Sequence, residues 1–210
     1  MKSYQTLLKF DKDEQIIQKS RFIGYASPVE TEQEALDFIN KIRKENKEAT
    51  HNCYAYIIGE NAGIMRYSDD GEPSGTAGLP IIEVLKVNKI VNVAVVVTRY
   101  FGGVLLGAGG LVRAYNSTCA RAINKAQIAT MYPSETYICE VAYPLWDRVE
   151  YSLKSLPIMR SNTSFMATVV FEICMKTTDT EMVFKTLTQV TEGKIEYMLE
   201  DTAYYPWLNT

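Results

Sequence analysis

The sequence has one histidine, His51, and four widely spaced cysteines with no Cys-x-x-Cys pair. Metallopeptidase, Ser-His-Asp and Cys-His schemes would all have to use that single imidazole, so composition argues against each of them. The cysteine spacing favours reduced, buried thiols over a disulfide framework or a zinc site. The scarcity of histidine and of paired cysteine therefore removes several common enzyme classes before any motif is examined.

Long apolar runs are also missing. No stretch approaches the roughly 20 apolar residues that a membrane-spanning helix needs. The N-terminal residues MKSYQTLLKFDKDEQ contain no apolar core of a signal peptide. We therefore expect a cytoplasmic protein with no membrane partner.

Strong charge of one sign is absent from the chain as a whole. The net charge is −3, made up of +2 over residues 1–125 and −5 over residues 126–210. An anion-binding surface is therefore expected on the first part. Neither part is basic enough to indicate nucleic-acid binding by charge alone, and the chain contains no DNA-specific motif.

Glycine, in contrast, is concentrated between Val97 and Tyr115, in VTRYFGGVLLGAGGLVRAY. Glycine inside an element costs backbone entropy, so this density indicates a need for positive φ angles or close approach. A loop of this kind that opens a helix can hold an anion with its N–H groups and the helix dipole. Arg99 and Arg113 flank the run. Its glycines are Gly102, Gly103, Gly107, Gly109 and Gly110.

The glycine run matches neither standard nucleotide loop. The Walker A motif would require Lys-Ser/Thr after Gly107, where Ala108 and Gly109 stand. The Rossmann pattern would require a third glycine where Val112 stands. ATP hydrolysis and dinucleotide binding therefore lose their usual support. A backbone site for a phosphate-like anion remains open, and so does tight helix–sheet packing as the sole reason for the glycines.

A second loop, Arg66–Pro80, brings Asp69, Asp70 and Glu72 close together in sequence. Oxygen ligands at this density could hold Mg²⁺ beside a phosphate. The alternative is a solvated Asp-Asp-Gly turn joined to a helix cap. Because both loops lead into helices through glycine-rich turns, we expect them to share one surface, with Mg²⁺ as a possible cofactor and no other predicted.

Two short segments complete the set of candidate sites. In Ala49–Tyr54, strand alternation would place His51 and Cys53 on one face and Asn52 on the other. His51 and Asn52 form a candidate polar site, and a buried thiol beside a hydrogen-bonding histidine is favoured over a Cys–His nucleophile pair. Lys19 and Arg21 open a strand, where they could contact phosphate or form a solvated edge.

The periodicity of the chain predicts the α+β class. Apolar residues recur at three and four residues across Thr31–Lys47, which predicts a helix with Thr31 as its N-cap and Glu34 completing a capping box. Residues 135–205 read strand–helix–strand–strand–helix–strand, the ferredoxin-like pattern. The boundary is expected at Met131–Ser134, which contains Pro133, and gives predicted domains over residues 1–130 and 134–210.

Four segments, KSRFIGYASPV, ATHNCYAYIIG, RYSDDGEPSGTAGLPI and VVVTRYFGGVLLGAGGLVRAY, occur in that order between residues 19 and 115. Together they resemble the YigZ/IMPACT family of small cytosolic proteins. The resemblance implies an N-terminal domain with the ribosomal protein S5 domain 2-like fold. It also implies a C-terminal ferredoxin-like domain similar to the last domain of the translocation elongation factor G.

The resemblance says less about function. Eukaryotic relatives regulate translation initiation by binding a partner of an initiation-factor kinase, through an additional N-terminal domain as well as the shared core. That partner is not carried over to this chain, and the bacterial branch has no settled biochemical activity. The kinship with ribosomal and elongation-factor domains favours contact with RNA or the ribosome by analogy.

The leading hypothesis is a translation-associated protein, more a binding protein than an enzyme, that contacts RNA or a ribosomal component. The glycine loops would let a phosphate approach closely. The basic side chains expected to contact the backbone are Lys19, Arg21, Arg66, Arg99 and Arg113. The rings available to stack on unpaired bases are Tyr54, Tyr67, Tyr100 and Phe101.

Two alternatives remain open. In the first, the protein is an enzyme acting on a small phosphorylated or nucleotide-like substrate, with Asp69, Asp70 or Glu72 holding Mg²⁺ or acting as base. The S5-like fold also hosts small-molecule kinases, although their phosphate loop has serines where this chain has Gly-Ala-Gly-Gly. In the second, the protein is an adaptor whose acidic C-terminal domain docks a partner protein through its exposed sheet face.

Overall fold

The computed structural model describes residues 2–207 and confirms the α+β class, with five helices and two antiparallel sheets in that range. The described chain divides into two compact units. Residues 4–130 form the first unit, and residues 131–207 together with residues 2 and 3 form the second. The outermost residues of the predicted domains, 1 and 208–210, lie outside the described part.

The first unit contains an antiparallel sheet in the order β2-β3-β6-β4-β5. Its strands are β2 (Asp11–Ile17), β3 (Ser20–Pro28), β4 (His51–Ile58), β5 (Ile64–Ser68) and β6 (Val93–Tyr100). The β-branched run before Arg99 predicts a strand covered on both faces, and the structure confirms it. β6 is the central strand, and its residues from Val93 to Arg99 are all buried.

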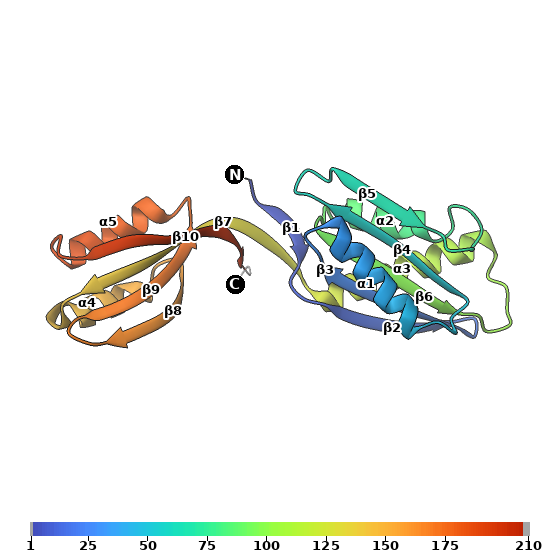
Figure 1. Ribbon diagram of the computed structural model, residues 1–210, viewed down its shortest axis with the longest axis horizontal. Helices are drawn as coiled ribbons and strands as arrows, with labels where there is room; N and C mark the ends of the chain where they lie inside the picture. Colours follow the sequence, from blue (N-terminus) through green and yellow to red (C-terminus); the bar gives the residue numbers. More distant parts are fainter. Residues whose placement is uncertain (1, 208–210) are drawn as a thin grey trace. The chain divides into compact units, whose positions relative to one another are not determined.

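Helices cover both faces of this sheet (Figure 1). α1 (Glu32–Glu45) packs its buried Ile39 and Ile42 with Val96 of β6. α2 (Gly78–Val87) and α3 (Gly107–Ala126) pack on the opposite face, where Tyr115 joins the cluster of Val95 and Val97. Because neighbouring residues of a strand point to opposite faces, one apolar strand supplies two separate cores.

Thr31 caps α1 as expected, because its hydroxyl oxygen accepts the Glu34 N–H at 3.2 Å. The Glu34 carboxylate accepts the N–H of Glu30 at 2.9 Å, not that of Thr31, so the capping box is not completed. The last three glycines of the run, Gly107, Gly109 and Gly110, form the first turn of α3, so the loop before it is residues 101–106 only. α2 begins at Gly78, within the Arg66–Pro80 loop. Glycine and proline are tolerated there because the N–H groups of a first turn have no intrahelical partner.

The second unit has the expected βαββαβ order, with strands in the spatial order β10-β7-β9-β8. Its expected boundary, Met131–Ser134, lies inside one continuous strand rather than in a loop. β7 also pairs with β1 (Tyr4–Leu7). The elements of the βαββαβ series are β7 (Ile128–Val141), α4 (Tyr143–Leu153), β8 (Ile158–Phe165), β9 (Val169–Lys176), α5 (Thr180–Val190) and β10 (Glu196–Trp207).

The two cores differ in what they bury. The core of the second unit is apolar, built around Val149, Phe171 and Leu187. Across the described residues, the only buried charged side chains are Glu72 and Arg99, both in the first unit. None of the helices in residues 2–207 is long and apolar enough to cross a membrane.

Candidate functional site

The centre of the candidate site is a buried ion pair. Arg99 Nη1, from the end of β6, donates to Glu72 Oε1 at 2.7 Å, and the two side chains are 6% and 3% exposed. Tyr115, from α3, donates its hydroxyl to the same oxygen at 2.8 Å. Taking two charges out of water is costly, so such a pair persists only with good geometry and further hydrogen bonds. The Arg66–Pro80 loop, β6 and α3 therefore meet at one carboxylate.

The second oxygen of Glu72 faces the histidine. Glu72 Oε2 lies 3.9 Å from His51 Nε2, and no hydrogen bond to Oε2 is seen among the described residues. His51 Nδ1 lies 2.8 Å from the Asp70 carbonyl oxygen. A carbonyl oxygen only accepts, so we assign a proton to Nδ1. In the neutral tautomer that this proton defines, Nε2 and Glu72 Oε2 are two acceptors 3.9 Å apart.

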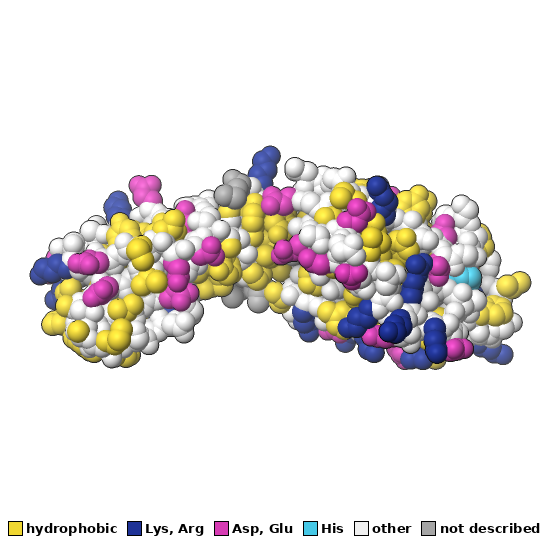
Figure 2. Space-filling model, in the orientation of Figure 1, with side chains coloured by type: hydrophobic (Ala, Val, Ile, Leu, Met, Phe, Trp, Pro, Cys, Tyr) yellow, Lys and Arg dark blue, Asp and Glu magenta, His cyan; other side chains and the backbone are white. Residues whose placement is uncertain are grey.

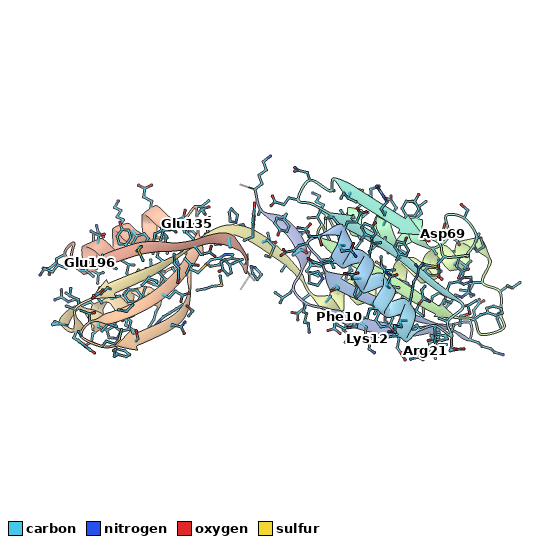
Figure 3. The ribbon with its side chains drawn as sticks, in the orientation of Figure 1. Phe10, Lys12, Arg21, Asp69, Glu135 and Glu196 are labelled. Atoms are coloured by element: carbon cyan, nitrogen blue, oxygen red, sulfur yellow. The ribbon has the colours of Figure 1, made fainter. Side chains whose placement is uncertain are left out.

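The other two carboxylates of the Arg66–Pro80 loop hold backbone in place. Asp69, which follows β5 in Figure 3, caps α2 by accepting the N–H groups of Gly75, Ala77 and Gly78 at 2.8–3.0 Å. Asp70 accepts from Arg43 Nη2 at 2.8 Å and from the Asn52 N–H at 2.7 Å.

This arrangement favours the turn-and-cap interpretation of the loop over Mg²⁺ binding. Asp69, Asp70 and Glu72 each serve a different partner, so their oxygens do not converge as ligands of one ion. Within residues 2–207 no group of three or more His, Cys, Asp or Glu side chains is arranged to hold a metal. Asp69 and Asp70 accept backbone N–H groups, whereas Glu72 accepts from the side chains of other elements.

Asn52 and Cys53 of β4 have structural partners. Asn52 Oδ1 accepts from the Thr98 hydroxyl at 2.7 Å, and Cys53 Sγ donates to the Asp69 carbonyl oxygen at 2.9 Å. Burial raises the pKa of the Cys53 thiol, and burial likewise raises the pKa of the Tyr115 hydroxyl. A thiol with a raised pKa is not the thiolate that a nucleophile requires.

A pocket of about 410 Å³ lies against this network. That volume is within the range of about 300–1,000 Å³ found for small-molecule sites. The polar residues that line it include His51, Glu72 and Arg99. Its remaining lining residues are Thr50, Gly71, Pro73, Phe101, Leu105, Leu106, Gly107, Ala108 and Leu111. The pocket therefore joins both loops that were predicted to share a surface.

At Gly102 and Gly107 the structure shows why glycine is required in the run. A Cβ at Gly102 would stand 2.0 Å from the Lys19 carbonyl oxygen, so this position requires a bare backbone against the β2–β3 turn. Gly107 has a φ of +68° and nothing within 4 Å of its Cβ position. α3 has no side-chain cap and no acidic residue in its first turn. Its first N–H groups therefore carry the positive end of a long helix dipole.

The predicted basic residues differ in how they are engaged. Lys19 and Arg113 are exposed, and neither forms an ion pair with a described residue. Arg21 pairs with Glu14 at 2.7 Å, and Arg66 donates to the carbonyl oxygen of its neighbour Met65. On the face shown in Figure 2, Lys and Arg side chains gather over β2 and the C-terminal end of α1, mixed with acidic ones.

Arg99 is paired with Glu72, and its predicted contact with a phosphate stays a prediction. Its guanidinium also lies 5.4 Å from the ring centroids of Phe22 and Phe101. Phe101 is 46% exposed and lines the pocket, and Tyr67 is exposed on β5. Two residues of the network were not predicted from the sequence. Tyr115 lies in the apolar stripe of α3, and Arg43 lies among the charged residues of α1, so neither position stands out as a site residue.

The comparisons with known proteins agree with the motifs. The Impact N-terminal domain model matches residues 18–123, the range that contains Glu72, Arg99 and Tyr115. The chain belongs to the IMPACT family. This confirms the resemblance to the YigZ/IMPACT family inferred from the four segments.

Among IMPACT relatives, the chain is 39% identical to IMPACT family member YvyE of Bacillus subtilis, over 96% of this chain and 93% of that protein. It is 36% identical to Protein IMPACT of Danio rerio, over 50% of this chain but only 33% of that longer protein. A solved structure described as a hypothetical protein shares 27% identity with a TM-score of 0.61, covering 96% of this chain and 98% of that one.

Proposed function

We propose that this IMPACT family member is a translation-associated, cytoplasmic protein whose first unit binds RNA. The observation that carries the proposal is the pocket of about 410 Å³, which opens at the uncapped N-terminus of α3 and is lined there by Gly107 and Ala108. Family membership fits a role related to translation. RNA offers both phosphates and bases, and the surface around this pocket can contact both.

The first turn of α3 is suited to an RNA phosphate. Its free N–H groups and helix dipole attract an anion. The Arg113 side chain lies over this turn, since Nη1 is 3.7 Å from the Cβ position of Gly109. The backbone of Lys19 abuts Gly102, in the loop before α3. An exposed arginine without an ion-pair partner among the described residues therefore lies at a bare helix end, and an exposed lysine belongs to the turn packed against the preceding loop.

The finer fold assignments belong to the same proposal. We infer an S5 domain 2-like fold for the first unit and a ferredoxin-like fold for the second, whose strand order β10-β7-β9-β8 supports it. Both folds occur in ribosomal or elongation-factor domains, which favours a ribosomal setting by analogy. In this account Arg21 and Arg66 make peripheral phosphate contacts, and Arg99 acts through Glu72.

The test is fluorescence-anisotropy binding of a 12-nucleotide single-stranded RNA from 50 to 200 mM salt. We expect affinity to fall with salt, because phosphate binding releases counterions. Arg113→Ala should reduce the slope of log affinity against log salt by about 0.7, the value for one phosphate contact on a single strand. Arg148→Ala, an exposed arginine of the second unit that pairs with Glu192, is the matched control and should change nothing. Salt-independent binding, or no binding, would reject the proposal.

An adaptor function has one observation in its favour. Tyr197, Met198 and Leu199 are consecutive on β10 and each is at least 49% exposed. If this strand docks a protein, Met198→Ser should abolish co-sedimentation with ribosomes while leaving RNA binding in vitro unchanged. Loss of co-sedimentation in Arg113→Ala but not in Met198→Ser would exclude the adaptor.

A further inference from the structure

We infer that the pocket beside Glu72 and His51 takes a guanine base, presented either by an unpaired nucleotide of RNA or by a free guanine nucleotide. For the RNA source the inference rests on the proposed function. It concerns the end of the pocket formed by the buried carboxylate, whereas the proposed phosphate site is at the first turn of α3.

The carboxylate end of the pocket presents two acceptor atoms to a ligand, whereas the unpaired Arg99 Nε is fully buried. Glu72 Oε1 already accepts from Arg99 and Tyr115, which leaves Oε2 for a ligand. His51 Nε2, 3.9 Å away, is the second acceptor, because Nδ1 holds the proton shared with the Asp70 carbonyl. A ligand that satisfies both must bring adjacent donors.

Guanine is the base that meets this requirement. Its Watson–Crick edge carries an N1–H group beside an N2 amino group, so two neighbouring donors point the same way. Adenine and cytosine place a donor next to an acceptor, and uracil has one N–H between two carbonyl oxygens. Each of these bases would bury an acceptor against Glu72 or leave it unpaired, which costs far more than losing one hydrogen bond in water.

The carboxylate is held rigidly for this role. Arg99 is 5% exposed and lines the pocket, and its Nε has no hydrogen-bond partner among the described residues. A buried cation with an unused donor is an expensive feature to maintain for fold stability alone. In this account it holds the Glu72 carboxylate in one orientation before the ligand arrives.

The apolar lining fits the faces of a flat ring. Phe101 and Leu105 are 46% and 85% exposed, and both line the pocket with Leu106. Stacking on an aromatic ring stabilises bases in single-stranded complexes. The same pocket reaches Gly107 and Ala108 at the start of α3, so one nucleotide would find acceptors at its base and donors at its phosphate.

The decisive experiment changes the ligand and leaves the protein intact. Wild-type protein is titrated with oligouridine 12-mers that carry one central guanine, inosine, 7-deazaguanine or adenine. Inosine lacks only the N2 amino group, and 7-deazaguanine keeps the full donor pair. We expect guanine and 7-deazaguanine to bind equally, and inosine and adenine to bind about 5- to 100-fold more weakly. Equal binding of all four would overturn the inference.

A protein variant checks that the discrimination arises at this pocket. His51→Leu removes the Nε2 acceptor without touching the Glu72–Arg99 pair, and it should reduce the guanine-to-inosine ratio toward one. Glu72→Gln serves as a second variant, because its amide would present a donor or a weaker acceptor to the base. A thermal melt establishes that each variant is folded at the assay temperature. A ratio unchanged in a folded His51→Leu protein would overturn the inference.

Titration with free nucleotides distinguishes a guanine in RNA from a free guanine nucleotide as the ligand. It also distinguishes failure of the guanine inference from failure of the proposed RNA-binding function. GMP and UMP are titrated by calorimetry against the same protein. RNA binding without a guanine preference would overturn the inference and leave the proposed function standing. GMP bound in preference to UMP, with no RNA bound, would support the pocket and reject the RNA function. Neither ligand bound would reject both.

Discussion

The two units each contain a tyrosine that donates to a glutamate, and the surroundings of the two pairs differ. In the first unit Tyr115 donates to Glu72, which is buried and also bound by Arg99. In the second unit Tyr137 donates to Glu135 at 3.0 Å, where the carboxylate is half-buried and also accepts from Thr180. The Tyr115–Glu72 pair lies beside a pocket, and its glutamate also forms an ion pair with Arg99. The Tyr137–Glu135 pair lies at the surface of its unit, where Glu135 also binds Thr180 at the start of α5.

This difference shows which unit buries charged groups among the described residues. The second unit buries only uncharged polar side chains, such as Thr136 and Thr191, around an apolar core. The first unit buries a full ion pair. A buried pair is weak evidence for stability, since a well-packed apolar replacement is often as stable. Its presence beside a pocket is therefore better explained by ligand binding.

The largest expected effect is that of Glu72→Gln on stability. The change leaves the Arg99 guanidinium buried without a counter-charge, so we expect the first unit to lose about 3–5 kcal/mol of unfolding free energy. Glu135→Gln removes the matched carboxylate of the second unit and should cost under about 1 kcal/mol, because water and two hydroxyls can still pair with the amide. Urea denaturation of both variants measures the comparison. Equal losses of unfolding free energy in the two variants would show that the buried ion pair contributes no more to stability than the half-buried carboxylate.

A smaller effect is expected from Asp69→Ala. This carboxylate accepts three N–H groups at the start of α2, and losing such a cap costs about 0.5–2 kcal/mol. Thr31→Ala, which removes the single hydroxyl cap of α1, is the control and should cost less. If Asp69 instead held Mg²⁺, adding the ion would raise the melting temperature of the wild type, and no such rise is expected.

The smallest effect concerns alkaline pH. Burial, followed by the hydrogen bond to Glu135, raises the pKa of Tyr137 to about 12. Burial also raises the pKa of Tyr115, which we expect not to ionise until the first unit unfolds. Both tyrosines release their protons more readily when unfolded, near the ordinary value of 10.0, so stability should fall as pH rises above about 10.

Absorbance at 295 nm, followed with circular dichroism, tests this order. Tyr137 should titrate while the protein is still folded, and Tyr115 only together with unfolding of the first unit. Replacing each tyrosine by phenylalanine assigns the two steps. Ionisation of Tyr115 in the folded protein would show that its environment is wetter than the structure indicates.

Much of the fold could be predicted because it depends on local patterns. The apolar run before Arg99 predicted the central strand, and Thr31 with Glu34 predicted the start of α1. The βαββαβ order followed from alternating strand and helix periods. Where the structure differs from the sequence patterns, tertiary packing overrides a local signal. Gly107, Gly109 and Gly110 are helical because the rest of α3 packs on the sheet. The second unit begins at residue 131, within the expected boundary Met131–Ser134, and β7 runs through that boundary.

The candidate site divides in the same way. Sequence patterns are enough to identify the family, the two loops and the residue types that carry charge. The packed fold establishes the contacts: Glu72 and Arg99 neutralise each other, Asp69 caps a helix, and Tyr115 donates to Glu72 from α3. The physical reason is that a charge acts through its neighbours in space. Residues 72, 99 and 115 become neighbours only when a loop, a strand and a helix pack together.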